Sequence, residues 1–479
     1  MTRPNPARLL LIIVLGALVI LVARLSIRVS AEDGEDKAQF IPKPVVVTRD
    51  IRLLQQYIAI DTSNPPGNET AGAQFLIRQI RAAGVSAELI ESAPGRGSVY
   101  ARIRGKHAGN ALLLMSHIDV VPAPAPGWRF PPFSGTIKYN EMYGRGTLDM
   151  KGIGICELRA FLDIAIRGVP PEHDVVFLAA ADEEQGSRFG VPWLLAHRPD
   201  IVDGVRYAIN EGGVTETHED QVAYFGIELG SKQSVKMRAH AVDRERLQRF
   251  RRELEPLFAP RDPDRILPEV RQFFQAIAPH RFESRAVLSD VDQTIAQGKF
   301  WLLPQGMREL TYNMVWAEGI APAENGSYEM PLVLLNLPDE EPGPRIASLK
   351  DKAREAGVDL EVLDVSGPVP LTGTNTPFYR MLVEAAHKAF GAIDVGPEML
   401  NGGMTDSRFL RARGISAYGF WPFPVGFYEA DGIHGLNERV RVDWYEAGVV
   451  LMRGLVTRYA YERRPEPENR AATGTGTVR

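Results

Sequence analysis

The chain of 479 residues contains one cysteine, Cys156, and only nine histidines. A single cysteine excludes an intrachain disulfide and any thiolate-based metal cluster, so a metal site would have to use histidine and carboxylate side chains. Positive charge is not in excess, since 55 Lys and Arg stand against 60 Asp and Glu, which argues against a nucleic-acid binder. Glycine, at 44 residues, and proline, at 35, are too few for a low-complexity chain. The composition indicates a globular protein.

One long apolar run is present, at residues 9–23, and Arg3 and Arg8 precede it. Positive residues followed by an apolar stretch are typical of a signal sequence. The run is long for a cleaved signal and short for a membrane span, so an uncleaved anchor and a cleaved signal both stay open. Either way we expect a membrane-anchored or secreted protein whose body is extracytoplasmic, in a periplasmic, extracellular or lumenal space. We assign 1–30 to this segment, 31–45 to a linker and 464–479 to a disordered tail.

Between these ends, short apolar runs alternate with helical patterns. We expect strands at 99–103, 111–115, 175–180 and 207–209, and helices at 48–60, 71–83 and 152–167. Continuously apolar strands separated by helices are typical of a buried sheet. The sequence therefore predicts an α/β fold with a mostly parallel central sheet and flanking helices.

The stretch 231–355 has a different pattern. It begins with an alternating strand near 234–238 and a charged helix near 243–257, and a long strand follows near 331–337. We interpret it as an inserted α+β domain. The α/β domain is then split into a first part at 46–230 and a second part at 356–463.

Acidic residues and histidines follow the predicted strands or occupy nearby loops. They are His117, Asp119, Asp149, Asp182, Glu183, Glu184, Glu211 and His434. Ligands of open α/β sheets bind beyond the carboxyl ends of the strands. Zn²⁺ takes imidazole and carboxylate ligands, and two metal ions side by side need a bridging group. Each of these residues alone is more often structural, but their recurrence at successive strand ends predicts a metal site.

These motifs resemble those of a known family. Together with Gly402-Gly403, Thr405–Arg408 and Asp61–Glu69, they are similar to the dinuclear zinc exopeptidases that include aminoacylase, carboxypeptidase S, carboxypeptidase G and succinyl-diaminopimelate desuccinylase. The nearest likeness is to the branch of carboxypeptidase S and N-acyl-amino-acid hydrolases. The resemblance covers Val46 to Tyr461 and implies a zinc-exopeptidase-like fold whose inserted domain serves as a lid and dimerisation domain.

The resemblance implies two bound Zn²⁺ ions, or another divalent metal. One ion would be held by His117, Glu211 and a bridging Asp149, and the other by Glu184, His434 and the same Asp149. Asp119 would orient His117. Glu183 would be the general base, taking a proton from the metal-activated water and giving it to the leaving amine. The implied reaction is hydrolysis of the amide bond of a peptide or N-acyl amino acid near a free carboxylate.

Substrate-binding residues follow less clearly from the resemblance. Arg408 is a candidate for the substrate carboxylate, and its alternative is a salt bridge to Asp406 or another acid. His240 matches a lid histidine that polarises the scissile carbonyl, often across a dimer interface, but it could be a plain loop histidine. The family's lid Asn and Arg fall near Gly319 and Leu335, so neither is kept. Either the substrate is more apolar at that end or activity is reduced.

A second function stays open at this point. The chain could be a catalytically silent zinc-containing binding protein whose altered lid contacts a partner. The presence of Glu183 argues against it, because a structural site needs Glu184 but has no use for a base. We expect a peptide or N-acyl-amino-acid substrate, no nucleic-acid partner, membrane contact through the N-terminal segment, and a homodimer formed through the inserted domain.

Overall fold

A computed structural model describes residues 46–213, 215–218, 221–258, 263, 266–323, 325–366, 370–401 and 403–463. The predicted signal or anchor, the linker and the tail lie outside the described residues. Within the described ranges, no helix combines the length and the apolar character that crossing a bilayer requires.

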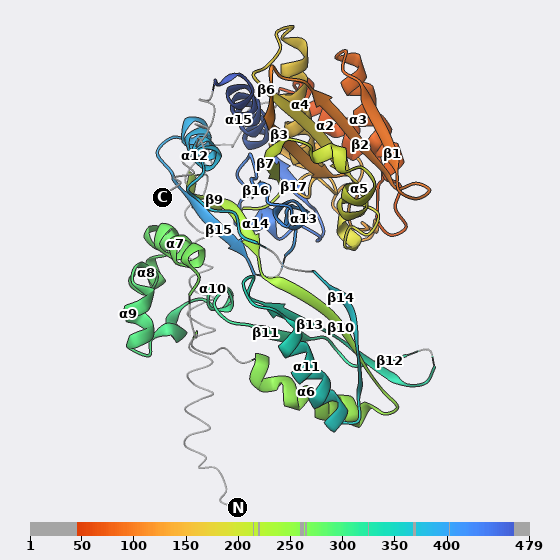
Figure 1. The fold of residues 1–479 in the computed structure, drawn as a ribbon, viewed down its shortest axis with the longest axis vertical. Helices are drawn as coiled ribbons and strands as arrows, with labels where there is room; N and C mark the ends of the chain where they lie inside the picture. Colours follow the sequence, from red (N-terminus) through yellow and green to blue (C-terminus); the bar gives the residue numbers. More distant parts are fainter. Residues whose placement is uncertain are drawn as a thin grey trace, which may run out of the picture. The chain divides into compact units, whose positions relative to one another are not determined.

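The central element is a nine-stranded sheet with the order β1-β2-β6-β3-β7-β16-β9-β15, and β8 pairs with β9 (Figure 1). Its strands are β1 Ala87–Glu91, β2 Gly97–Ile103, β3 His107–His117, β6 His173–Ala180, β7 Val205–Asn210, β8 Thr215–His218, β9 Gln221–Ser231, β15 Asp394–Leu400 and β16 Ser416–Gly419. The strands from β6 to β16 run parallel, whereas β1 and β2 form an antiparallel edge. The predicted mostly parallel sheet is confirmed.

Helices flank this sheet. They are α2 Arg49–Ile58, α3 Glu69–Ala82, α4 Lys151–Ile166, α5 Val191–His197, α12 Pro377–Phe390, α13 Ser407–Arg411, α14 Phe427–Ala430 and α15 Val442–Tyr461, with a 3₁₀ turn, η1, at Glu183–Gln185. Helix α4 is buried on nearly every side because it packs between β3, α2 and α15. Cys156 is fully buried within it. This buried helix fixes the position of the loop that precedes it.

A small three-stranded sheet ties two distant parts of the chain together. Its order is β17-β5-β4, with β4 at Thr136–Lys138, β5 at Glu141–Tyr143 and β17 at Arg439–Arg441. Strand β5 precedes the segment that contains Asp149, and β17 follows the segment that contains His434. The pairing of β5 with β17 therefore brings these two segments together.

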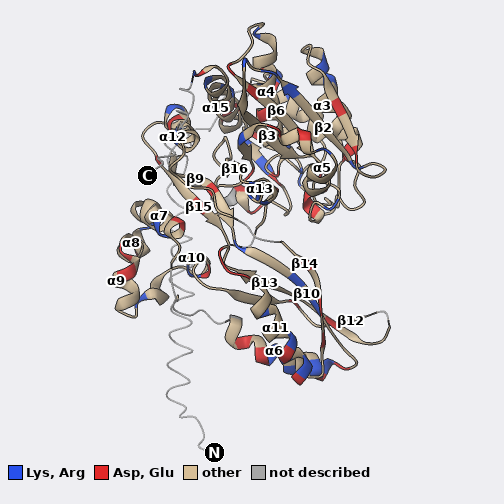
Figure 2. Cartoon of the chain, in the orientation of Figure 1, with Lys and Arg blue, Asp and Glu red and all other residues tan. Residues whose placement is uncertain are grey.

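The inserted region forms a second sheet, which we call the lid sheet, with the order β11-β13-β10-β14 and with β12 on β13. Its strands are β10 Gln233–Ala241, β11 Met314–Ala317, β12 Ala321–Pro322, β13 Tyr328–Asn336 and β14 Asp359–Val365. Helices α6 Arg244–Phe258 and α11 Gly343–Glu355 pack against one face (Figure 1). Charged residues of both signs lie along α6 (Figure 2), while its Leu247, Phe250 and Leu254 enter the lid core.

The sheets divide the chain differently from the predicted boundary at 231–355. Strand β14 lies after residue 355, yet it pairs with β10 in the lid sheet. Conversely, part of the insertion packs on the central sheet, where Phe274 of α7 shares a core with Tyr224 of β9 and Met399 of β15. The short helices of this part are α7 Pro268–Ile277, α8 Arg285–Ser289, α9 Val291–Ala296 and α10 Gln305–Glu309. Local periodicity shows where strands occur but not which sheet they join.

A single residue, Lys232, separates β9 of the central sheet from β10 of the lid sheet. Its side chain is buried, and its Nζ donates to the backbone carbonyls of Glu309 at 2.6 Å and Tyr312 at 2.8 Å. Its backbone N–H donates to the carbonyl of Leu400 at 3.2 Å. Burial lowers the pKa of Lys232 to about 7, and the charge of Glu309 offsets this only in part. We call Lys232 the hinge between the two sheets. Its buried amine ties this connection to the carbonyls of Glu309 and Tyr312.

We expect Lys232→Met to change how stability depends on pH. The ordinary pKa of the amine is 10.5, so between pH 7 and this value the unfolded chain binds a proton that the folded chain lacks. The wild-type free energy of unfolding therefore gains up to about 1.4 kcal/mol per pH unit from this residue across that window. The variant lacks this gain. Urea unfolding at about pH 7 and about pH 9 measures the difference, and parallel profiles for the two proteins would contradict it.

Candidate active site

The residues singled out in the sequence come from adjacent elements. His117 ends β3, Glu183 and Glu184 lie in η1 after β6, and Glu211 follows β7. Strands β6, β3 and β7 are neighbours in the sheet and run parallel, so their carboxyl ends meet at one edge. Asp149 reaches this edge from the loop before α4, and His434 from the loop between α14 and β17.

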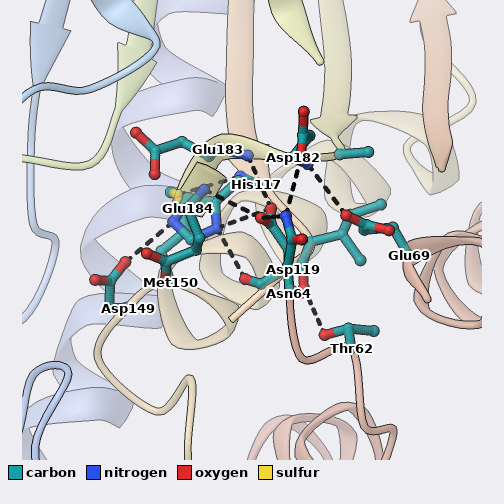
Figure 3. Close-up of polar contacts among 12 residues, drawn as sticks. Thr62, Asn64, Glu69, His117, Asp119, Asp149, Met150, Asp182, Glu183 and Glu184 are labelled. Atoms are coloured by element: carbon teal, nitrogen blue, oxygen red, sulfur yellow. Dashed lines mark hydrogen bonds and ion pairs between the residues drawn. The ribbon is translucent and has the colours of Figure 1, made fainter. Parts of the chain in front are cut away.

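Asp149 lies between the two histidines. Its Oδ1 is 3.0 Å from Nε2 of His117, and its Oδ2 is 3.0 Å from Nε2 of His434. Each oxygen of one carboxylate thus faces one imidazole, which is the arrangement that a group bridging two metal ions requires. Figure 3 shows Asp149 beside His117 and Glu184.

Two further carboxylates complete the arrangement. Oε2 of Glu211 is 3.6 Å from Nε2 of His117, and Oε2 of Glu184 is 3.1 Å from Nε2 of His434. Ligand atoms of His117, Asp149 and Glu184 lie within 4.8 Å of one another, and so do those of His117, Glu183 and Glu211. The other oxygen of Glu184, Oε1, is buried without a hydrogen-bond partner. This set of nitrogen and oxygen donors, with one buried oxygen left unsatisfied, fits a pair of divalent cations.

The electrostatics of the cluster agree with a site for cations. Burial, with a smaller contribution from the charge of Asp149, raises the pKa of Glu211 to about 8. Hydrogen bonds to Asp149 and Glu184 raise the pKa of His434 to about 10. Burial and the neighbouring Glu211 also raise the pKa of Glu183 well above its usual range. Burial disfavours so many negative charges close together. Bound cations would therefore stabilise the ionised carboxylates of the cluster.

Asp119 is fully buried behind this edge. Nδ1 of His117 donates to the backbone carbonyl of Asp119 at 2.9 Å, and the Asp119 carboxylate lies farther away, at 3.6 Å. Because Nδ1 then carries the proton, Nε2 presents its lone pair toward Asp149. The Asp119 carboxylate accepts the backbone N–H groups of Glu183 and Glu184, both at 3.1 Å. Asp119 thus orients His117 through its backbone and η1 through its side chain (Figure 3).

Glu438 is fully buried and had no role among the residues predicted from the sequence. Its carboxylate accepts the backbone N–H groups of Gly146, Leu148 and Asp149 at 2.8–3.1 Å and the Arg145 guanidinium at 2.6 Å. Glu438 therefore fixes the loop that presents Asp149. The available signal was an acidic residue four positions after His434.

A second supporting network was also missed. Asn64 donates to Asp119 at 2.9 Å and to Asp182 at 3.0 Å, and Arg96 pairs with Asp182 and with buried Glu69. Asn64 and Glu69 belong to the Asp61–Glu69 segment. This segment contributed to the family resemblance, but no role was predicted for its residues. This network joins the start of the domain to the loop after β6.

Arg408, in α13, is buried, and its Nη1 donates to the carbonyl of Thr405 at 3.0 Å. Within the described ranges, no carboxylate lies within ion-pair distance of its guanidinium, and its Nε is buried without a partner. The alternative of a salt bridge to Asp406 is not formed: Asp406 accepts a hydrogen bond from Ser187 Oγ at 2.5 Å, and the charge of Arg408 acts on it only from beyond ion-pair distance. Arg408 thus keeps donors available for a ligand.

The residues predicted for the lid belong to the lid sheet, not to the strand ends and loops that carry the cluster. His240 belongs to β10 rather than to a loop, and its nearest charged partner is Glu361, at 3.9 Å on β14. Among the described residues it makes no hydrogen bond or ion pair with the five proposed ligands. Leu335 lies on β13 opposite Met314 and Ser234, and Gly319 lies between β11 and β12.

The chain is similar in sequence and in fold to several known proteins. The chain is 24% identical over 396 residues to N-fatty-acyl-amino acid synthase/hydrolase PM20D1 of Xenopus tropicalis, covering 74% of this chain and 73% of that protein. It is 26% identical over 427 residues to aminoacylase-1 of Mus musculus, covering 86% and 95%. The fold matches the M20 family metallo-carboxypeptidase Sso-CP2 from Sulfolobus solfataricus with a TM-score of 0.66 and 20% identity, over 86% of this chain and 99% of that one.

The profile of one protein family matches residues 113–458, which is well over half of the chain and includes His117, Asp149 and His434. The chain therefore belongs to peptidase family M20/M25/M40 and is a hydrolase of amide bonds.

Proposed function

We propose that this chain is a dizinc hydrolase that cleaves the amide bond of a peptide or an N-acyl amino acid. The observation that carries this proposal is the position of Asp149, whose two oxygens each face one imidazole at 3.0 Å. His117 and Glu211 would complete one metal site, and Glu184 and His434 the other. The names of the relatives, an aminoacylase and an N-acyl-amino-acid hydrolase, support this substrate class.

The residues around the ions have distinct proposed roles. Bound zinc would supply a water of lowered pKa and would polarise the scissile carbonyl. Glu183 takes the proton of the attacking water and passes it to the leaving amine, because it lies beside His117 and Glu211 and has a raised pKa. Asp119 holds Glu183 in place through the backbone of η1.

Arg408 is the proposed partner of the substrate carboxylate. Its guanidinium is buried, has no carboxylate partner within the described ranges, and follows closely after Asp406, whose charge acts on Glu183. A guanidinium binds a carboxylate through paired hydrogen bonds. This position favours a substrate with a free carboxylate near the cleaved bond, which N-acyl amino acids and the C-terminal residues of peptides share.

The test is hydrolysis by the zinc-loaded full chain of a panel of dipeptides and N-acyl amino acids. We expect turnover of at least one substrate class, its loss after chelation, and its return with added zinc. A protein that binds zinc but turns over no member of the panel would instead support the silent binding protein. Amidated substrates without a free carboxylate serve as the matched control for Arg408.

We also propose that the apolar run at 9–23 directs the protein to or across a membrane, with the hydrolase outside the cytoplasm. The support is the sequence pattern alone, since these residues lie outside the described ranges. Cell fractionation with and without residues 1–30 tests this. Retention of the full chain in the cytoplasm would contradict it.

Homodimer formation through the inserted domain is a further proposal. His240 lies near the end of β10 that is far from the hinge at Lys232. It would therefore serve the active site of a second copy rather than its own. Sedimentation of the full chain gives the oligomeric state. A monomer at working concentration, with unchanged turnover in His240→Ala, would contradict both the dimer and a role for His240.

A further inference from the structure

Three consecutive buried residues, Asp406, Ser407 and Arg408, lie at the start of helix α13. This short helix packs beside β7 and β16, near the edge of the sheet where the candidate site lies (Figure 1). Buried polar groups normally have hydrogen-bond partners, so the contacts of these three residues deserve separate description. Two of the three contact segments that carry proposed groups of the reaction.

Asp406 contacts the turn that bears the proposed base. Its carboxylate accepts a hydrogen bond from Ser187 Oγ at 2.5 Å, and the backbone N–H of Ser187 donates to the carbonyl of Asp182 at 2.7 Å. Asp182 and Ser187 therefore bracket Glu183 and Glu184. Through Ser187, Asp406 holds the far end of the turn that presents the base and one proposed metal ligand.

The backbone of this turn is strained at both ends. Asp182 has a φ of 72° and Ser187 a φ of 65°, in the left-handed region that residues other than glycine seldom adopt. Such conformations persist only where surrounding contacts impose them, and they are common at functional sites. Asp182 is fixed within its own segment, since its Oδ2 accepts the N–H of Phe189 at 2.8 Å. Ser187 is fixed by Asp406, from a distant part of the sequence.

Ser407 contacts the other side of the cluster. Its Oγ accepts a hydrogen bond from Nδ2 of Asn210 at 3.2 Å, and both residues are buried. Asn210 is the last residue of β7, and Glu211, a proposed metal ligand, follows it directly. Neighbouring residues of α13 thus contact the segments on two sides of the cluster.

Arg408 is the third residue of this group. Its guanidinium donates to the carbonyl of Thr405, and its Nε has no partner among the described residues. The other end of α13 is fixed by a buried ion pair between Arg411 and Glu228 of β9. Burial raises the pKa of Asp406, and the positive charge of Arg408 opposes this rise. An anion bound to Arg408 would therefore act on Asp406 through its charge and through the shared turn of helix.

We propose that Asp406 and Ser407 are positioning residues that couple a substrate carboxylate bound at Arg408 to the placement of the base and the metal ligands. Asp406 acts on the turn of η1 through Ser187. Ser407 acts on the end of β7 through Asn210. This inference rests on the proposed function and deepens it. The free carboxylate then raises kcat as well as affinity, because binding energy from a group remote from the cleaved bond is used to order the reacting groups.

The experiment compares each hydrolysed substrate of the panel with its C-terminal amide, using the zinc-loaded full chain. In wild type, kcat for the free acid is expected to exceed kcat for the amide by about tenfold or more. In Asp406→Ala and Ser407→Ala this ratio should fall toward one, while KM for the free acid changes by less than about threefold. The zinc content of both variants should equal that of wild type.

Conservative variants and a control separate coupling from a structural defect. Asp406→Asn keeps an acceptor oxygen for Ser187, and Ser407→Thr keeps the hydroxyl, so both should preserve most of the wild-type ratio. Leu410→Val is the matched control, because Leu410 lies on the same helix but packs in the core beside the sheet. It should lower stability and leave the ratio unchanged. Equal losses on acid and amide in Asp406→Ala, or a loss of zinc, would overturn the proposal.

Hydrogen exchange separates this inference from the proposed function, because it requires no turnover. The probes are phenylalanine, glutamate and lysine, which carry the carboxylate but no bond to cleave, and their amides. At least one amino acid is expected to slow exchange of the backbone amides at 182–187 in wild type but not in Asp406→Ala, whereas the amides should not. Slowed exchange without hydrolysis of any substrate would support the coupling while the proposed function fails. Hydrolysis with unchanged exchange would leave the proposed function standing and overturn the inference.

Discussion

Replacement of Glu183 by glutamine is expected to lower kcat by about 10²–10⁴-fold, the usual contribution of a general acid–base residue. The amide has the shape of the carboxylate but cannot accept the proton of the attacking water. The backbone of residue 183 would still donate to Asp119, so η1 should keep its conformation. The measurement is kcat on the best substrate of the panel, together with the zinc content of the purified variant.

Glu184→Gln provides the matched control, since the two residues are adjacent and of equal length. Glu184 contacts His434 at 3.1 Å, so its loss should reduce zinc content as well as activity. Glu183→Gln should retain the wild-type zinc content. Wild-type turnover in Glu183→Gln would remove the assignment of the base, and a loss of zinc in that variant would mean that Glu183 is a ligand.

Replacement of Glu438 by alanine is expected to lower the free energy of unfolding by about 3–5 kcal/mol, the usual result of removing one partner of a buried ion pair. Arg145 would remain buried without its counter-ion, and the N–H groups of Gly146, Leu148 and Asp149 would lose their acceptor. Because these groups belong to the loop that presents Asp149, zinc affinity should fall too. Chemical unfolding and a zinc competition titration measure the two effects.

An exposed ion pair supplies the comparison. Glu384 pairs with Arg458 on the surface, where both side chains are about half exposed, and Glu384→Ala should cost at most about 1 kcal/mol. Glu438→Gln should fall between the two, since it keeps the shape and an acceptor oxygen but not the charge. A Glu438→Ala variant as stable as Glu384→Ala, with unchanged zinc affinity, would show that the loop does not depend on this carboxylate.

The central sheet could be predicted because its strands carry their own signal. Residues 111–115 and 175–180 are continuously apolar, and the structure buries them in adjacent parallel strands. The division between the two sheets could not be predicted in the same way. Strand β14 and helix α7 have ordinary local patterns, and their assignment depends on pairing with β10 and packing on β15, contacts between segments that are distant in the sequence.

The candidate site shows the same limit. The residues proposed as ligands could be found because imidazole and carboxylate side chains follow strand ends. The residues that support them could not, because their signal is tertiary. Glu438 is one acidic residue among 60 Asp and Glu, and only the fold shows its carboxylate accepting three backbone N–H groups of another loop. Likewise, the backbone role of Asp119 toward His117 depends on a turn that no spacing rule describes.

The pairing of β5 with β17 has a consequence for biosynthesis. His117, Asp149, Glu184 and Glu211 are translated well before His434, a proposed ligand of the second ion, and Glu438, which fixes the Asp149 loop. A nascent polypeptide that has emerged only as far as the lid therefore lacks both. If the proposed metal pair binds at this site, its binding must await synthesis of the 432–441 segment, so a ribosome-stalled product ending before that point should be sensitive to proteases and deficient in metal.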